Sequence, residues 1–139
     1  MIAFPAFAAL VAALCAASLV WDAIHRPRPE RITWALAFII FALAAGSEVI
    51  GATLGWSPVL ARIYYLCGAV LVVGVLALGE LYLLFPGKLP SFTTGLALLI
   101  AALAATVVWS APIDQQRLQA DGWHAIERGP VLIALAVAL

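Results

Sequence analysis

The chain has 139 residues, of which 66% are hydrophobic and 10% are charged, and its mean hydropathy is +1.14. An ordinary soluble domain is about half apolar and about one quarter charged. Seven basic and seven acidic side chains cannot cover a water-exposed surface, so the composition excludes a soluble monomer and predicts that lipid is the solvent. The formal net charge is zero and provides no basic stripe for phosphates, so we expect no nucleic-acid partner.

Apolar runs that are long enough to cross a bilayer, which takes about 20 helical residues, follow one another along the chain. They cover residues 2–24, 32–54, 59–85 and 91–110. The segment 25–31 separates the first two runs, because its prolines stop a helix and its arginines cannot enter lipid. Ser57 and Pro58 suit the cap and first turn of the third run. The segment 86–90 precedes the fourth run, for which Ser91 is the expected cap.

The polar residues 111–129 follow the fourth run and are expected to form an outer loop. Residues 130–139 are apolar again and begin with a proline, as helices often do. Ten residues rise only about 15 Å, half of a bilayer, so we expect the start of a fifth helix that a longer natural chain would complete. A half-spanning segment is the alternative. The predicted fold class is an all-α, single-domain transmembrane bundle with four full helices and the start of a fifth.

The distribution of basic residues predicts the orientation of the chain. The turns 25–31 and 86–90 carry the larger share, namely Arg26, Arg28, Arg31 and Lys88, against Arg117 and Arg128 in the loop 111–129. Lys and Arg prefer the cytoplasmic side, so both turns are expected there, with the N-terminus and the loop outside. All five tryptophans lie near the ends of the runs, where we expect them to anchor helices at the membrane interface, namely Trp21, Trp34, Trp56, Trp109 and Trp123.

Glu48 is the most informative residue, because it lies about six residues, or about 9 Å, inside the outer end of the second run. A carboxylate there is costly unless it is neutral, paired or in a wet cavity. The hairpin at residues 55–58 brings Arg62 alongside, so we expect an ion pair between the two. Hydroxyl groups that would complete a polar cluster belong to Ser47, Tyr64 and Tyr65. Two interpretations remain open, a clip that holds the hairpin together and a site for a ligand, ion or proton.

Small residues beside Glu48 form a stripe at spacings of four, namely Ser47, Gly51 and Gly55. Such a stripe allows helices to approach closely in lipid. At the other end of the bundle, Glu80 is expected to pair with Arg31 or Lys88 at the inner interface. Asp22 and Arg26 are four residues apart and form a second expected pair.

The sequence predicts no catalytic residues, no metal and no cofactor. His25 and His124 lie on opposite sides of the membrane, no Cys/His cluster has zinc spacing, and no lysine lies within a run to form a Schiff base. The first functional hypothesis is a non-catalytic subunit or scaffold, whose partners are the lipid bilayer and other transmembrane helices in a homo- or hetero-oligomer. The alternative is a carrier of a small solute, ion or proton, or a membrane sensor, that uses Glu48, Arg62 and Tyr65.

The second and third runs resemble uncharacterised multi-pass membrane proteins of GC-rich bacteria. The resemblance rests on Glu48-Val49-Ile50-Gly51, Gly55-Trp56, Arg62-Ile63-Tyr64-Tyr65 and the glycine-dotted helix through Leu83-Leu84. It implies a bacterial plasma membrane and more transmembrane helices than this chain contains. It implies no activity and no role for any residue.

Overall fold

The four predicted membrane helices are confirmed in the computed structural model, which describes residues 3–87, 91–113 and 118. The helices long and apolar enough to cross a membrane are Ala3–His25, Pro29–Leu54, Pro58–Leu84 and Phe92–Ser110. The chain is therefore an all-α membrane protein with the predicted fold class. The expected fifth helix, residues 130–139, and most of the expected outer loop lie outside the described residues.

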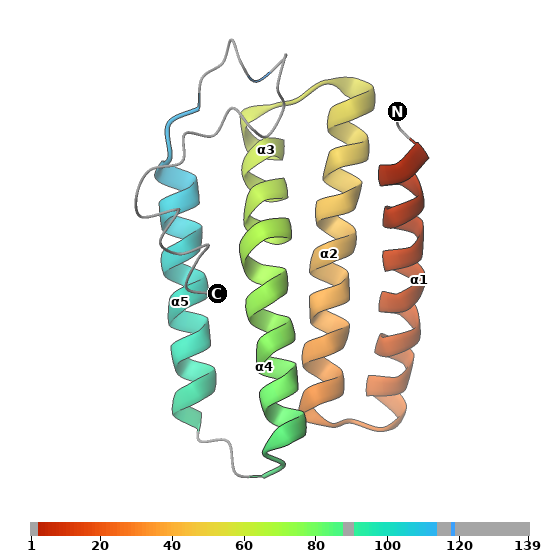
Figure 1. The fold of residues 1–139 in the computed structure, drawn as a ribbon, viewed down its shortest axis with the longest axis vertical. Coiled ribbons are helices and arrows are strands. Elements are labelled where there is room, and N and C mark those ends of the chain that lie inside the picture. The colour runs from red at the N-terminus through yellow and green to blue at the C-terminus, as the bar shows by residue number, and fades with distance from the viewer. Residues whose placement is uncertain (1–2, 88–90, 114–117, 119–139) are drawn as a thin grey trace.

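The helices stand side by side in chain order (Figure 1). They are α1 (Ala3–His25), α2 (Pro29–Leu54), a third span made of α3 (Pro58–Tyr65), the π-helix η1 (Leu66–Leu71) and α4 (Val72–Leu84), and finally α5 (Ser91–Ser110). The main contacts of α1 are with α2, those of α2 extend to the third span, and those of the third span extend to α5. Each helix is therefore packed mainly against its neighbours in sequence, and α1 and α5 form the two edges.

The turn between α1 and α2 is shorter than the predicted segment 25–31, because α2 already begins at Pro29. Proline lacks the backbone N–H that the first turn of a helix leaves unpaired, and its fixed φ suits that position. Arg28 is extended and precedes it as the cap residue. The hydroxyl of Thr33 then donates to the carbonyl oxygen of Pro29 at 2.7 Å. The predicted start of this helix at residue 32 is wrong, because Pro29 begins the helix and does not interrupt it.

The hairpin between α2 and α3 forms as the sequence predicts. Gly55 ends α2 with φ at 95°, a conformation that favours glycine. The Ser57 hydroxyl accepts a hydrogen bond from the backbone N–H of Leu60 at 3.2 Å, and Pro58 occupies the first turn of α3. This short connection holds the ends of the two helices together, so side chains in the last turns of α2 lie opposite the first turns of α3.

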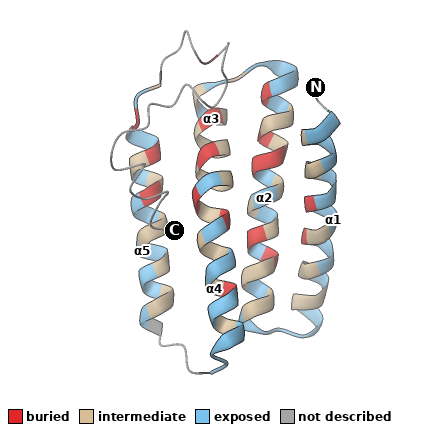
Figure 2. Cartoon of the chain, in the orientation of Figure 1, coloured by how far each residue is buried: buried red, intermediate tan, exposed pale blue. Residues whose placement is uncertain are grey.

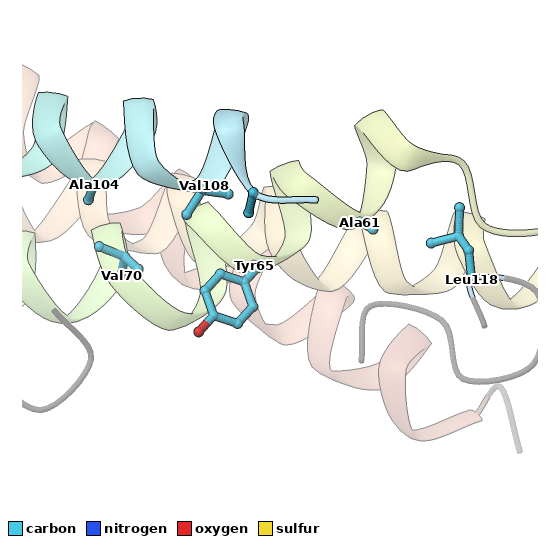
Figure 3. Packing of buried hydrophobic residues seen from close by; sticks show 7 residues of the cluster. Ala61, Tyr65, Val70, Ala104, Val108 and Leu118 are labelled. Atoms are coloured by element: carbon cyan, nitrogen blue, oxygen red, sulfur yellow. The ribbon is translucent and has the colours of Figure 1, made fainter. Parts of the chain in front are cut away.

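Most of the surface of each helix is exposed or only half-buried, as expected when lipid is the solvent (Figure 2). A group of mutually packed buried residues joins the third span to α5 and to residues after it, and is called here the α3–α5 cluster. Its members are Ala61, Tyr65, Val70, Ala104, Val108, Ala111 and Leu118 (Figure 3). Three of its members are alanines, and small residues at an interface let helices approach closely in a membrane.

Candidate functional site

The Glu48 carboxylate is held by a neutral donor from the neighbouring helix. Tyr64 donates a hydrogen bond from its hydroxyl to Oε2 of Glu48 at 3.2 Å, and the contact is part-buried. The α2–α3 hairpin explains the contact, since it is antiparallel and places the last turns of α2 against α3. Two of the predicted polar residues are therefore brought together.

The Tyr64 ring also contacts the Trp56 ring. The two rings meet edge to face, with centroids 5.6 Å apart and planes at 83°, an arrangement that aromatic pairs favour. The Trp56 indole in turn occupies the space beside Gly51, where a Cβ would lie 2.5 to 2.8 Å from three of its atoms. The absence of a side chain at Gly51 therefore makes room for the Trp56 indole. The sequence predicts Trp56 as an interface anchor and does not predict this contact.

Arg62 points away from Glu48 and instead contacts the C-terminal end of α5 and the residue that follows it. Its Nη2 donates to the carbonyl oxygen of Ala111 at 3.2 Å, and its Cζ lies 5.7 Å from the centroid of the Trp109 ring, within the range of a cation–π contact. No ion pair joins Arg62 to Glu48 in the part of the chain that the structure describes.

The periodicity of α3 explains why these two partners separate. Successive residues of an α-helix are turned by about 100°, so residues 62 and 64 point in nearly opposite directions. A helix that presents Tyr64 to α2 therefore presents Arg62 to α5. Tyr65, three residues after Arg62, also lies on the α5 side, where it is 7% exposed within the α3–α5 cluster. Of the predicted polar cluster, only Glu48 and Tyr64 share a hydrogen bond among the described contacts.

The predicted small-residue stripe is divided in the structure. Ser47 and Gly51 are buried, whereas Gly55 is exposed. The Ser47 hydroxyl donates to the carbonyl oxygen of Leu43 at 2.8 Å within its own helix, which satisfies the hydroxyl without a ligand. Ser47 and Gly51 therefore serve packing, and the role of Gly55 is to make the turn.

At the opposite end of the bundle, Asp22 and Arg31 form an ion pair with each other, whereas the sequence predicts a different partner for each. Arg31 Nη1 lies 2.9 Å from Oδ2 of Asp22, which ties the start of α2 to the end of α1. Asp22 therefore pairs across the turn rather than with Arg26. Glu80 is exposed, and no ion pair joins it to Arg31 within the described ranges. Its other expected partner, Lys88, lies outside the described residues.

The sequence analysis missed three further features of the fold. The Trp34 indole occupies the space beside Gly79, where a Cβ would lie 2.5 Å from Nε1. Tyr82 and Thr94 share a hydrogen bond of 2.5 Å between α4 and α5. The third span changes to π-helical pairing over Leu66–Leu71, and π-helical turns are frequent at functional sites. A glycine inside a membrane span, as at Gly79, can indicate the close approach of a bulky side chain such as Trp34. We find no sequence pattern that indicates the π-helix.

The described residues contain few groups that could bind an ion or react. Over residues 3–87, 91–113 and 118, no group of three His, Cys, Asp or Glu side chains is arranged to hold a metal ion. The Glu48 carboxylate with its phenol donor provides a group that accepts a proton or a cation. No known protein family, curated protein or solved structure matches the chain.

Proposed function

We propose that this protein is a non-catalytic membrane subunit that packs its helices against partner helices in a larger assembly. The proposal rests on Gly46, in the middle of α2. A Cβ added there meets no atom within 4 Å, unlike the positions of Gly51 and Gly79, which are filled by tryptophans of the same chain. Glycine costs about 1 kcal/mol relative to alanine inside a helix, so a glycine with open space beside it is explained by a partner backbone that approaches closely.

The surroundings of Gly46 support the same proposal. Exposed apolar side chains flank it on one face of α2, namely Ile39, Leu43 and Ile50. Because the helices stand in a row (Figure 1), this face of α2 is left uncovered by the other helices of the described ranges. A partner helix crossing at Gly46 would bury these side chains.

The experiment that tests the proposal compares oligomeric states in mild detergent and in lipid nanodiscs by native mass spectrometry. The wild-type chain of 14.6 kDa is expected in a complex of higher mass, and Gly46→Leu is expected to release the monomer. Ala52→Leu is the matched control, because it adds a bulky side chain at an exposed position of α2 that lies outside the face of Gly46. A wild-type chain that is monomeric and without partners in both media would overturn the proposal.

A second candidate function, a carrier or sensor, is favoured by the partner of Glu48. A carboxylate held by a phenol rather than by an arginine keeps its capacity to take up a proton or cation, and ionisable groups within membrane spans commonly mark such pathways. Its test is proton uptake by proteoliposomes that contain a pH-sensitive dye. If the protein is a carrier, Glu48→Gln is expected to fold and assemble normally but to lose proton uptake. Equal uptake by wild type and variant would contradict the carrier function.

We also propose an orientation and a cellular location for the protein. We place the N-terminus outside and the turns 25–31 and 86–90 in the cytoplasm of a bacterium, supported by the excess of basic residues in those turns and by the resemblance of the second and third spans. The test is labelling by an impermeant thiol reagent in intact cells. With Cys15 and Cys67 replaced by alanine, Ser57→Cys is expected to react and Arg28→Cys is expected to remain protected.

A further inference from the structure

The third span changes its backbone hydrogen bonds between α3 and α4. At the end of α3, the N–H of Leu66 donates to the carbonyl oxygen of Arg62, four residues earlier. At the end of η1, the N–H of Val72 donates to the carbonyl oxygen of Cys67, five residues earlier. A turn closed over five residues holds one residue more than an α-helical turn. The π-helix therefore places one additional residue between α3 and α4.

Contacts with both neighbouring helices fix the rotation of α3 about its axis. Tyr64 donates to Glu48 of α2, and Arg62 donates to the carbonyl oxygen of Ala111, just after α5. Ala61 is 0% exposed and belongs to the α3–α5 cluster (Figure 3). A rotation of α3 by one residue would break these contacts together.

A separate set of contacts fixes the rotation of α4. Gly79 lies against α2, where the Trp34 indole fills the space beside it. Tyr82 shares a hydrogen bond with Thr94 of α5. The two halves of the third span are thus held independently, near opposite ends of the bundle (Figure 1).

A straight α-helix of the same sequence would not satisfy the contacts of α3 if α4 stayed in place. Without the π-helical turn, α3 would be rotated by one residue, or about 100°, relative to α4. Tyr65 would then take the position of Tyr64 opposite Glu48. Arg62 would take the position of Ala61, where a long charged side chain would enter a fully buried site.

The contacts of α4 would be lost if α3 stayed in place instead. Leu78 would then take the position of Gly79. Even a Cβ at that position overlaps the Trp34 indole, so a leucine there would force α4 away from α2. Both sets of contacts are therefore satisfied only when the additional residue is absorbed between the two halves.

We propose that η1 is the element that positions Tyr64, rather than Tyr65, against Glu48. It absorbs one residue more than a straight helix would hold, so α3 and α4 each keep their own contacts. The proposal is independent of whether the protein is a subunit or a carrier, because it concerns the rotation of the third span and not a ligand or a partner.

The first test deletes Ala69, an exposed residue of η1. Removal of the additional residue is expected to convert η1 to an α-helix and to preserve both sets of contacts, so the midpoint of thermal unfolding in detergent is expected within about 5 °C of wild type. Deletion of Ala102 is the matched control, because it removes an exposed alanine from α5, a regular α-helix. That deletion rotates one half of α5 against the other by about 100° and is expected to lower the midpoint by at least about 10 °C.

The second test asks which tyrosine meets Glu48 in the chain that lacks Ala69. Double-mutant cycles of the unfolding equilibrium are expected to give the wild-type coupling between Glu48→Gln and Tyr64→Phe, and no coupling between Glu48→Gln and Tyr65→Phe. Coupling that disappears or moves to Tyr65 would overturn the proposal. So would a deletion of Ala69 that damages the fold as much as the deletion of Ala102, because the additional residue would then be required rather than absorbed.

Discussion

The Tyr64 hydroxyl donates to Oε2 of Glu48 at 3.2 Å, so the acidic side chain of α2 is held by a neutral phenol of α3. Arg62, two residues earlier on α3, binds the carbonyl oxygen of Ala111. The hairpin is therefore joined by a hydrogen bond at one face of α3, and the C-terminal end of α5 is joined to the opposite face. These two contacts make separate contributions to stability, and mutational coupling distinguishes them.

A double-mutant cycle between Glu48→Gln and Tyr64→Phe is expected to give a coupling of about 0.6 to 1.7 kcal/mol, because side-chain hydrogen bonds in membranes have that magnitude. The measurement is the free energy of unfolding of the detergent-solubilised protein. The control cycle combines Glu48→Gln with Arg62→Gln, which share no described contact, and coupling below about 0.5 kcal/mol is expected. Strong coupling in the control cycle would instead support the ion pair that the sequence predicts.

The sequence is sufficient to predict the membrane helices but not their facing residues. Apolar length and prolines located each span to within three residues, since both act locally. The partner of Glu48 depends on the rotation of α3, which the sequence does not give, and Arg62 and Tyr64 are only two positions apart along the chain. Trp56 shows the same difficulty, because its position near a helix end is typical of an interface anchor, whereas its contact with Gly51 depends on the hairpin geometry.

Gly51→Ala and Gly46→Ala are expected to have opposite effects on the stability of the monomer in detergent. At Gly51 the new Cβ overlaps the Trp56 indole, and such overpacking typically costs about 1 to 3 kcal/mol. At Gly46 the Cβ enters open space, so the better helix propensity of alanine stabilises the monomer by up to about 1 kcal/mol. Thermal unfolding followed by circular dichroism measures both. Equal destabilisation by the two substitutions would show that Gly46 is also packed within the chain.

Trp109→Leu is expected to destabilise the protein by about 0.5 to 2 kcal/mol through loss of its cation–π contact with Arg62. Leucine retains an apolar side chain but has no ring face for the guanidinium. In an Arg62→Gln background the same substitution is expected to cost less, because the cation is already absent. Trp21→Leu is the control, since Trp21 is exposed and its described ring contact is with His25, not with a guanidinium. An equal cost of Trp109→Leu in both backgrounds would contradict the cation–π contact.

Exchange of the two charges in the pair between Asp22 and Arg31 is expected to restore stability that either single reversal removes. The side chain of Asp22 is 50% exposed and that of Arg31 is 24% exposed, so water and salt screen the pair and each reversal is expected to cost about 1 kcal/mol or less. The exchanged variant, Asp22→Arg with Arg31→Asp, keeps the number of basic residues at this end, and therefore the determinant of orientation. Unfolding measured at low and high salt provides the second readout, because screening should reduce the cost of each reversal. If the exchanged variant is no more stable than the single reversals at low salt, α1 is held to α2 by apolar packing alone.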